Sequence, residues 1–238
     1  MKKMINPKYV LVNAIEERLN ITLTDEQLAY IFSEDQELVM TTPRKYGKDL
    51  ITAIKIAVHL ILKDNHKIGV LCSSKNIAKG VHQQVKEILE LLNANNQIRF
   101  CSKNPCRILM NNDSQVNMFS SDAEIRGHRL DEAYIMEFLH RQGMNDAFNR
   151  VLMLLLHNRD HRLNIIGTPT ISISMEGILN RSNITHIAVE GTMQHFNSTA
   201  ISEELSEFAR PDEMIFNART NEYYIANQFG EFVRCNLQ

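Results

Sequence analysis

The segment Pro43–Asp49, PRKYGKD, is the feature that most constrains what this chain can fold into. A short apolar run, Glu37–Met40, precedes it, and a long apolar helical pattern, Leu50–Leu62, follows it. A strand, a turn with Gly-Lys and a helix form the layout of a phosphate-binding loop, where backbone N–H groups at the helix N-terminus face phosphates. The match is incomplete, because the segment has one glycine where the full pattern has two. In addition, Asp49 stands where Ser or Thr normally binds Mg²⁺.

Two cationic side chains of this segment are candidates for contacting nucleotide phosphates. Lys48 would neutralise the β- and γ-phosphates, since a cation at the positive end of a helix dipole is unfavourable without an anionic partner. Arg44 lies in the same turn and is within reach of a phosphate; the alternative is a plain surface arginine. The other residues of the predicted nucleotide-binding loop are Pro43, Lys45, Tyr46 and Gly47.

A catalytic carboxylate is predicted at Glu137. The apolar run Ala133–Met136 is typical of a buried strand. An acid at the end of such a strand can polarise the attacking water beside a γ-phosphate. The triplet Asp131-Glu132-Ala133 is similar to such a motif, but residues 128–130 before it lack the pattern of a buried strand. The alternative for Glu137 is an exposed acid at a strand end.

Thr168 and Gln27 are the remaining candidates. Thr168 follows an apolar strand, Leu163–Ile166, and its hydroxyl could sense the γ-phosphate and relay its loss; the alternative is a simple strand-to-loop turn at Pro169. Gln27 lies 21 residues before Lys48 and could hydrogen-bond an adenine edge. Its alternative role is structural, as the fourth residue of a capping box that Thr24 opens.

The whole pattern predicts an α/β fold with a central, mostly parallel sheet flanked by helices, because apolar strands alternate with helical segments. Short strand candidates around 98–102, 107–110 and 115–120 predict a small β insertion or edge hairpin. The 238 residues carry a net charge of −2, so any contact with DNA must come from a local patch. The run Leu50–Leu62 is too short to span a bilayer, and the cysteines and histidines show no metal-site spacing.

Taken in order, these segments resemble the ATPase domain of the large terminase subunit of tailed bacteriophages. The segments that carry the resemblance are LTDEQLAYI, TTPRKYGKD, KIGVLCSSKNIAKGVHQQVKEIL, SSDAEIRGHRLDEAYIMEF, NIIGTPT and NEYYIANQFGEF. The resemblance implies a RecA-like P-loop NTPase. Its divisions would be a helical lead-in over residues 1–35 with the adenine-contacting segment, an ATPase core over 36–200, and a closing segment over 201–238.

The resemblance also implies what the protein does. It implies hydrolysis of ATP with Mg²⁺, coupled to translocation of double-stranded viral DNA into a prohead. The implied partners are double-stranded DNA, the portal protein, the small terminase subunit and further copies in a ring, although the isolated domain can be monomeric. The implied location is the host cytoplasm and, transiently, the portal vertex. The family's nuclease domain would begin about where this chain stops, so we expect no nuclease activity from it.

Two positions depart from the family pattern, and both concern Mg²⁺. The family usually has a hydroxyl after Gly-Lys and an Asp just before the catalytic Glu; here the residues are Asp49 and Met136. A thioether is a poor ligand for Mg²⁺, which prefers hard oxygens. We therefore hypothesise that the metal-facing carboxylate has moved to Asp49. One alternative is a degenerate nucleotide-binding or scaffolding subunit without useful hydrolysis, and another is a superfamily 2 helicase-type ATPase core.

Overall fold

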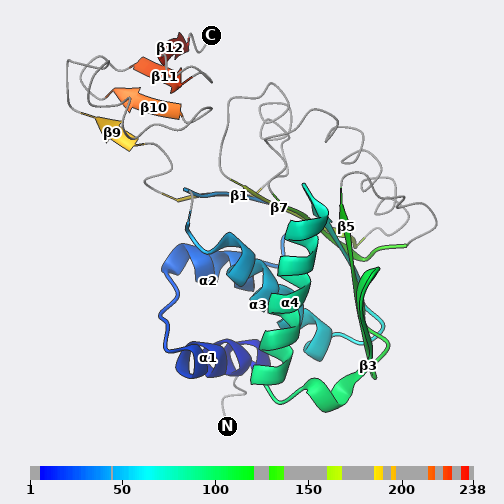
Figure 1. The fold of residues 1–238 in the computed structure, drawn as a ribbon. Coiled ribbons are helices and arrows are strands. Elements are labelled where there is room, and N and C mark those ends of the chain that lie inside the picture. The colour runs from blue at the N-terminus through cyan, green and yellow to red at the C-terminus, as the bar shows by residue number, and fades with distance from the viewer. Residues whose placement is uncertain are drawn as a thin grey trace.

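An eight-stranded, mostly parallel sheet is the centre of the fold, as the alternation of strands and helices predicts (Figure 1). The computed structural model describes residues 6–43, 45–120, 129–136, 160–167, 185–189, 194–196, 214–217, 222–226 and 232–235. The order of the strands across the sheet is β3-β4-β5-β2-β6-β7-β1-β8. The strands are β1 (Glu37–Thr41), β2 (Lys67–Cys72), β3 (Ile98–Lys103), β4 (Cys106–Met110), β5 (Gln115–Ser120), β6 (Glu132–Met136), β7 (Arg162–Gly167) and β8 (Thr185–Ala188).

The six neighbouring strands β5-β2-β6-β7-β1-β8 run parallel to one another, and in the described part of the sheet the antiparallel pairs are β3–β4 and β4–β5. The predicted small β insertion is thus confirmed for β3 and β4. The third strand of that predicted group, β5, pairs with β4 on one side and in parallel with β2 on the other, so it belongs to the parallel part of the sheet. Burial explains the difference, because Val116–Ser120 is buried continuously, whereas β4 alternates and β3 is largely exposed. Continuous burial is typical of a parallel strand that is covered on both faces.

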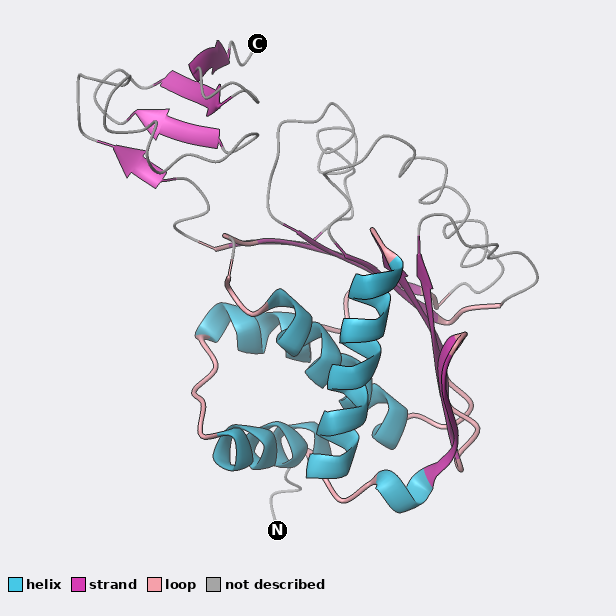
Figure 2. Ribbon diagram, in the orientation of Figure 1, coloured by secondary structure: helices cyan, strands magenta, loops and turns pink. Residues whose placement is uncertain are grey.

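Four helices lie together on one face of this sheet (Figure 2). They are α1 (Pro7–Leu19), α2 (Asp25–Phe32), α3 (Lys48–Leu62) and α4 (Lys75–Leu91). A short 3₁₀ helix, η1 (Asn95–Gln97), follows α4. Local sequence sets the N-termini of α1, α2 and α4, because the Asn6, Thr24 and Ser74 side chains accept hydrogen bonds from backbone N–H groups of the first turn.

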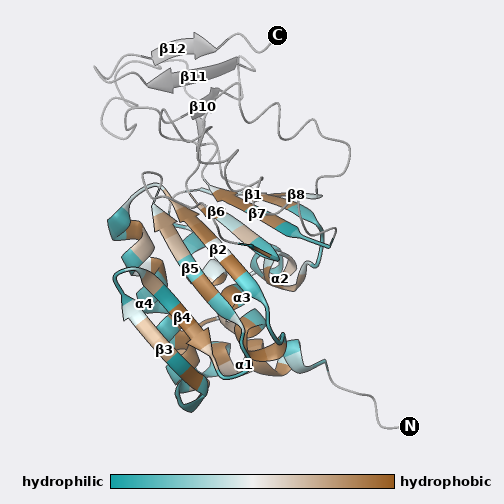
Figure 3. Cartoon of the chain, turned by 90° about the vertical axis from the view of Figure 1, so that its right-hand side faces the viewer, coloured by the Kyte–Doolittle hydropathy of each residue, from teal (hydrophilic) through white to brown (hydrophobic). Residues whose placement is uncertain are grey.

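Helix α3 lies at the centre of the helical layer and packs against α1, α2 and α4. It is buried from Ile51 through Leu60 without a break, as its nearly uniform apolar pattern predicts. The strands that face it are also apolar, and Figure 3 shows them as brown bands through the sheet. One continuous core joins the helical layer to the sheet. The loop before α3 is therefore attached to rigid elements at both of its ends.

The last strands form a second sheet of four, in the order β12-β11-β10-β9. Its strands are β9 (Gln194–Phe196), β10 (Met214–Asn217), β11 (Glu222–Ala226) and β12 (Phe232–Cys235). Strands β10, β11 and β12 are antiparallel neighbours, and β9 joins β10 in parallel. Within the described ranges, no helix has the length and apolar character that crossing a membrane requires.

Candidate nucleotide-binding site

The connection from β1 to α3 has the geometry that the sequence predicts for a phosphate-binding loop. Strand β1 ends at Thr41, and α3 begins at Lys48, directly after the turn. Gly47 is the N-cap residue and offers no side chain to the first backbone N–H groups of the helix. Because the first N–H groups of a helix have no partner inside the helix, this end can bind an anion. Lys45, Gly47 and Asp49 are exposed, so the loop is open to solvent.

Two residues of the loop have left-handed backbone conformations. Gly47 has φ of 83°, and Lys45 has φ of 64°. Glycine adopts this region without strain, whereas a residue with a Cβ atom pays an energetic penalty. The single glycine of the segment thus occupies the position at which the chain turns into α3.

Helix α2 holds the loop from one side through Gln27. The Gln27 amide donates a hydrogen bond from Nε2 to the Tyr46 carbonyl oxygen at 2.9 Å. Its Oε1 accepts from the Thr24 backbone N–H at 2.9 Å, which completes the predicted capping box. The Tyr46 hydroxyl lies 2.6 Å from Thr24 Oγ1 and donates to Glu26 Oε2 at 3.3 Å. Gln27 therefore lies beside the loop, while its contact with adenine stays a prediction.

The carboxyl ends of β1, β7 and β6 meet at one edge of the sheet. Met40 pairs with Ile166 of β7, and Ile166 pairs in turn with Met136 of β6. Since β7 separates β1 from β6, the ends of β1 and β6 are about 10 Å apart at the usual spacing of strands. Lys48 follows one end, and residue 137 follows Met136 at the other. The loop that ends at Lys48 and the strand that ends at Met136 therefore lie at the same edge of the sheet.

Met136 belongs to the hydrophobic core. It is 1% exposed and packs with the buried residues of α3 and the neighbouring strands. The predicted site residues Arg44, Glu137 and Thr168 lie outside the described residues, so their roles stay predictions. Of the two departures from the family pattern, one is thus a core side chain, and the other, Asp49, is exposed beside the loop.

Asp49 is the described residue at the loop that fits Mg²⁺. Its carboxylate offers hard oxygens in the first turn of α3 and is open to solvent. Burial raises the pKa of the Cys72 thiol at the end of β2, and the negative charge of Asp49 raises it further. The Asp49 carboxylate therefore lies within electrostatic range of the same sheet edge. With one carboxylate, the protein would hold Mg²⁺ jointly with nucleotide phosphates, which is a usual arrangement for this ion.

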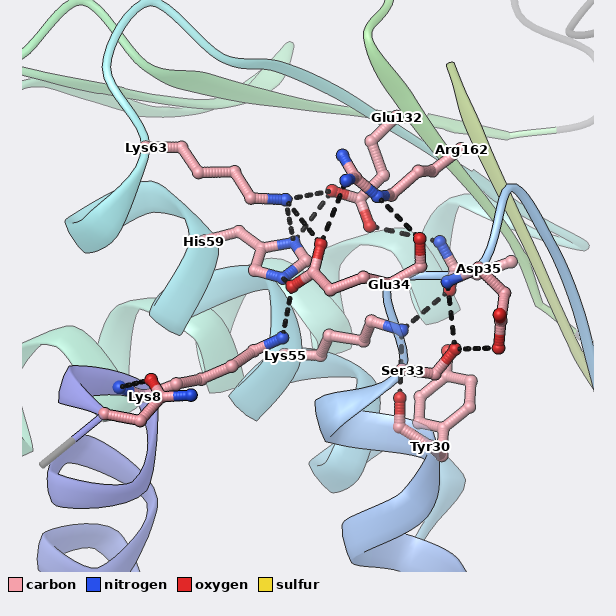
Figure 4. Close-up of polar contacts among 12 residues, drawn as sticks. Lys8, Tyr30, Ser33, Glu34, Asp35, Lys55, His59, Lys63, Glu132 and Arg162 are labelled. Atoms are coloured by element: carbon pink, nitrogen blue, oxygen red, sulfur yellow. Dashed lines mark hydrogen bonds and ion pairs between the residues drawn. The ribbon is translucent and has the colours of Figure 1, made fainter. Parts of the chain in front are cut away.

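A second polar site, here called the Glu132 cluster, lies at the opposite edge, where β6 begins (Figure 4). It consists of Glu34, Lys55, His59, Lys63, His66, Glu132, Tyr134, Arg162 and Asn164. The Glu132 carboxylate is fully buried, and each of its oxygens accepts two hydrogen bonds. Oε2 accepts from His59 Nδ1 at 2.8 Å and from His66 Nε2 at 2.9 Å. Oε1 accepts from the Tyr134 hydroxyl at 2.8 Å and from Asn164 Nδ2 at 3.1 Å.

Electrostatics keep Glu132 ionised inside the protein. Burial acts to raise the pKa of its carboxyl group, but the charge of His59 and the hydrogen bonds from His59 and His66 outweigh it and hold the pKa well below its usual range. Glu132, the first residue of β6, therefore has a structural role as a buried, ionised carboxylate. Its place at this edge supports the exclusion of the Asp131-Glu132-Ala133 triplet from the phosphate side.

Lys55 extends the cluster toward α2. Its ammonium donates to the Tyr30 carbonyl and to Asn164 Oδ1, both at 2.9 Å, and lies 4.8 Å from the centre of the Tyr30 ring. Burial lowers the pKa of Lys55 to about 7. Because Asn164 also donates to Glu132, its amide connects the buried cation to the buried anion.

Glu34 closes the cluster at the surface, where Figure 4 shows Lys63, His59 and Arg162 converging on it. Its carboxylate lies 3.4 Å from Lys63 Nζ and 3.1 Å from Arg162. His59, His66 and Glu132 have donor atoms within 4.8 Å of one another, as a metal site would. Their 2.8 and 2.9 Å separations are hydrogen-bond lengths, however, and Lys63 Nζ lies 3.9 Å from the same oxygen. The positive charge of Lys63 would repel a divalent metal ion. The geometry therefore supports a hydrogen-bonded ion cluster and not a metal site.

The Glu132 cluster and the Tyr46 contacts were not predicted from the sequence. Lys55 and His59 interrupt an otherwise apolar helix. Because a buried charge requires a partner, these two residues could have indicated a buried polar cluster. The partner residues are separated from them by up to 109 positions, and no spacing rule reveals them. Tyr46 is an aromatic residue in a predicted loop, and nothing in the sequence indicates its contact with Thr24.

Comparison with known proteins places the fold. Scans against protein-family models and curated protein sequences find no match. The Thermus phage P74-26 large terminase ATPase domain matches with a TM-score of 0.61 and 18% identity over 74% of this chain and 84% of that chain. The HK97 bacteriophage large terminase matches with a TM-score of 0.65 and 13% identity over 85% of this chain and 47% of that chain. This chain thus spans about half of the HK97 protein.

The fold also extends beyond terminases. A structure of S. cerevisiae Dbp5 with ADP, Nup159, Gle1 and IP6 matches with a TM-score of 0.55 and 14% identity over 78% of this chain and 52% of that chain. At these identities the likeness concerns the fold. The predicted fold is confirmed: the chain has a mostly parallel sheet flanked by helices, and this fold is similar to that of the phage large-terminase ATPase domains.

Proposed function

We propose that this chain is an ATPase that drives double-stranded viral DNA into a prohead, as the motor domain of a large terminase. The observation that carries the proposal is the strand order, in which β7 separates β1 from β6. This order sets the Lys48 loop and the end of β6 about two strand spacings apart, roughly 10 Å, on one edge. The terminase-like fold and the terminase-like order of motifs support the same function.

Each candidate residue then has a role in hydrolysis. Lys48 binds the β- and γ-phosphates at the start of α3, and Arg44 stabilises the charge that develops on them. Glu137 orients the attacking water, and Thr168 couples the loss of phosphate to motion. Gln27 contacts adenine and holds the loop through the Tyr46 carbonyl.

Asp49 supplies the protein oxygen for Mg²⁺, which would neutralise charge on the phosphates. A comparison of three variants tests this assignment: Asp49→Ser, Met136→Asp and the double variant, each assayed for Mg²⁺-dependent ATPase activity. The relocated carboxylate predicts that Met136→Asp improves the Asp49→Ser enzyme. A double variant that unfolds at the same urea concentration as Asp49→Ser and hydrolyses ATP no faster would reject the relocation.

The decisive experiment measures ATP turnover by the purified chain. Lys48→Ala and Glu137→Gln should each lower the rate by on the order of 10²-fold or more, because they remove phosphate neutralisation and water activation. Lys86→Ala is the matched control, since Lys86 pairs with Glu90 on the surface of α4 at 3.2 Å. Wild-type turnover in both site variants would refute the proposal.

One specific observation favours a second function. Because Met136 is a core residue and cannot bind Mg²⁺, the site is short of the family's usual metal carboxylate. A degenerate subunit would bind an ATP analogue without measurable turnover and would serve as a nucleotide-binding or scaffolding part of the packaging complex. Titration of a fluorescent ATP analogue beside the turnover assay separates the two functions.

The likeness to Dbp5 keeps a helicase-type ATPase as a third possibility. The substrate distinguishes it from a packaging motor. A packaging motor should be stimulated by blunt duplex DNA, whereas a helicase-type core should be stimulated by single strands or by duplexes with single-stranded tails. ATPase rates with these nucleic acids at equal nucleotide concentration make the comparison.

A further inference from the structure

A basic groove lies between α4 and the turn that joins β3 to β4. Its volume is about 420 Å³, and its lining residues are Lys79, Gly80, His82, Gln83, Lys103 and Asn104. The groove is separate from the β1–α3 loop. Four strand spacings separate β5, beside the turn, from β1, which corresponds to about 20 Å.

The described side chains that line the groove are hydrogen-bond donors, and none of them is a carboxylate. Lys79 and Lys103 are exposed, and within the part of the chain that the structure describes neither ammonium group forms an ion pair. Further along α4, Glu87 accepts a hydrogen bond from Gln83 at 2.9 Å, and Glu90 pairs with Lys86 at 3.2 Å. The acids of α4 are thus engaged outside the groove.

The groove opens at the edge of the sheet where the nucleotide loop lies. Helix α4 begins at Lys75, shortly after the carboxyl end of β2, and Lys79 lies one turn further on. Arg107 pairs with Asn117, so the β3–β4 turn extends toward the carboxyl end of β5. We propose that this basic groove binds phosphates of the DNA backbone, with Lys79 and Lys103 as the contacting cations. The inference rests on the proposed function, since it identifies the surface on which the motor would contact DNA.

The chemistry fits contacts that do not depend on base sequence. Most protein–DNA hydrogen bonds go to phosphate and sugar, and Lys, Asn and Gln side chains are common donors in them. The whole chain carries a net charge of −2, so attraction to DNA must come from such a local concentration of lysines. The groove therefore provides the local positive charge that the net charge of the chain does not.

Salt dependence of DNA binding tests the proposal on the intact chain. Fluorescence anisotropy with a 30-base-pair duplex would give the affinity between 50 and 200 mM salt. Two phosphate contacts contribute about 1.8 to the slope of log K against log salt, or about 12-fold in affinity over this range. The Lys79→Ala/Lys103→Ala variant should lose that component equally on two unrelated duplex sequences. The Lys79→Arg/Lys103→Arg variant should retain it.

Arg99→Ala is the matched control, because Arg99 is an exposed cation at the other end of β3 and pairs with Asp113 at 2.7 Å. Its slope should equal that of the wild type. An unchanged slope in the double alanine variant, no binding of duplex by the wild type, or equal binding of polyglutamate would overturn the proposal. ATP turnover without DNA should be normal in the groove variants. If the double alanine variant lowers the salt slope but the wild-type chain hydrolyses no ATP, the ATPase proposal is rejected and the DNA-binding groove is supported.

Discussion

Replacement of Glu132 by Gln tests whether the Glu132 cluster stabilises the fold as an ion cluster. The carboxylate accepts four hydrogen bonds in a fully buried place. The amide of Gln keeps one acceptor oxygen, so the two bonds at the other position lose their charge-assisted acceptor. At about 1.5–3 kcal/mol for each bond to a charged group, the loss is about 3–6 kcal/mol. The cost of breaking a buried ion pair, about 3–5 kcal/mol, agrees.

Urea unfolding followed by circular dichroism gives the free energy of unfolding for the comparison. Glu90→Gln is the control, because its side chain is 46% exposed and its ion pair with Lys86 is screened by solvent. We expect this control to cost at most about 1 kcal/mol. A loss below about 1 kcal/mol for Glu132→Gln at an unchanged m-value would refute the reasoning, since the cluster would then contribute no more than a surface ion pair.

The difference in the free energy of unfolding between wild type and Glu132→Gln should depend on pH, which gives a second check. The folded-state pKa of Glu132 is lowered, so the stability that its charge supplies is present above the unfolded pKa, about 4.3, and is lost as the pH falls through the folded value. The difference in the free energy of unfolding between wild type and Glu132→Gln should therefore shrink as the pH falls below about 4. A difference that grows on acidification would contradict the assigned charge state.

Three further substitutions test the loop and the sheet. Gln27→Ala should lower stability by about 1 kcal/mol, because it breaks the capping box, and should weaken binding of an ATP analogue; unchanged affinity in that titration would argue against a role of Gln27 at the nucleotide. Gly47→Ala should cost about 1–2 kcal/mol in urea unfolding because of its φ of 83°, and Gly47→Asn should cost less; equal costs would contradict the backbone explanation. Gly69→Ala should cost about 1–3 kcal/mol in thermal melts, since a Cβ there would lie 2.5 Å from Leu130 Cδ1, and a neutral result would mean that Leu130 moves freely.

The sequence alone determined the order and type of the elements that form the parallel sheet and its helices. Periodicity and caps are local, so they identified the β1–turn–α3 layout and the capping box of α2. The Gly-Lys pair located the loop, because a left-handed turn into a helix favours glycine there, although α3 begins at Lys48, two residues before the apolar pattern that starts at Leu50. Residue-level expectations for Arg44, Glu137 and Thr168 come from the sequence alone.

Only the tertiary structure decided which strands are neighbours. The insertion of β7 between β1 and β6, and the pairing of β5 with β2, join segments far apart in the chain. A run of apolar residues indicates a buried strand, but it does not identify the strand with which it pairs. The same reason explains the Glu132 cluster, whose Lys55 and Asn164 are 109 residues apart. A charged residue in an apolar helix indicates that a partner is required, but only the folded chain shows which side chain binds it.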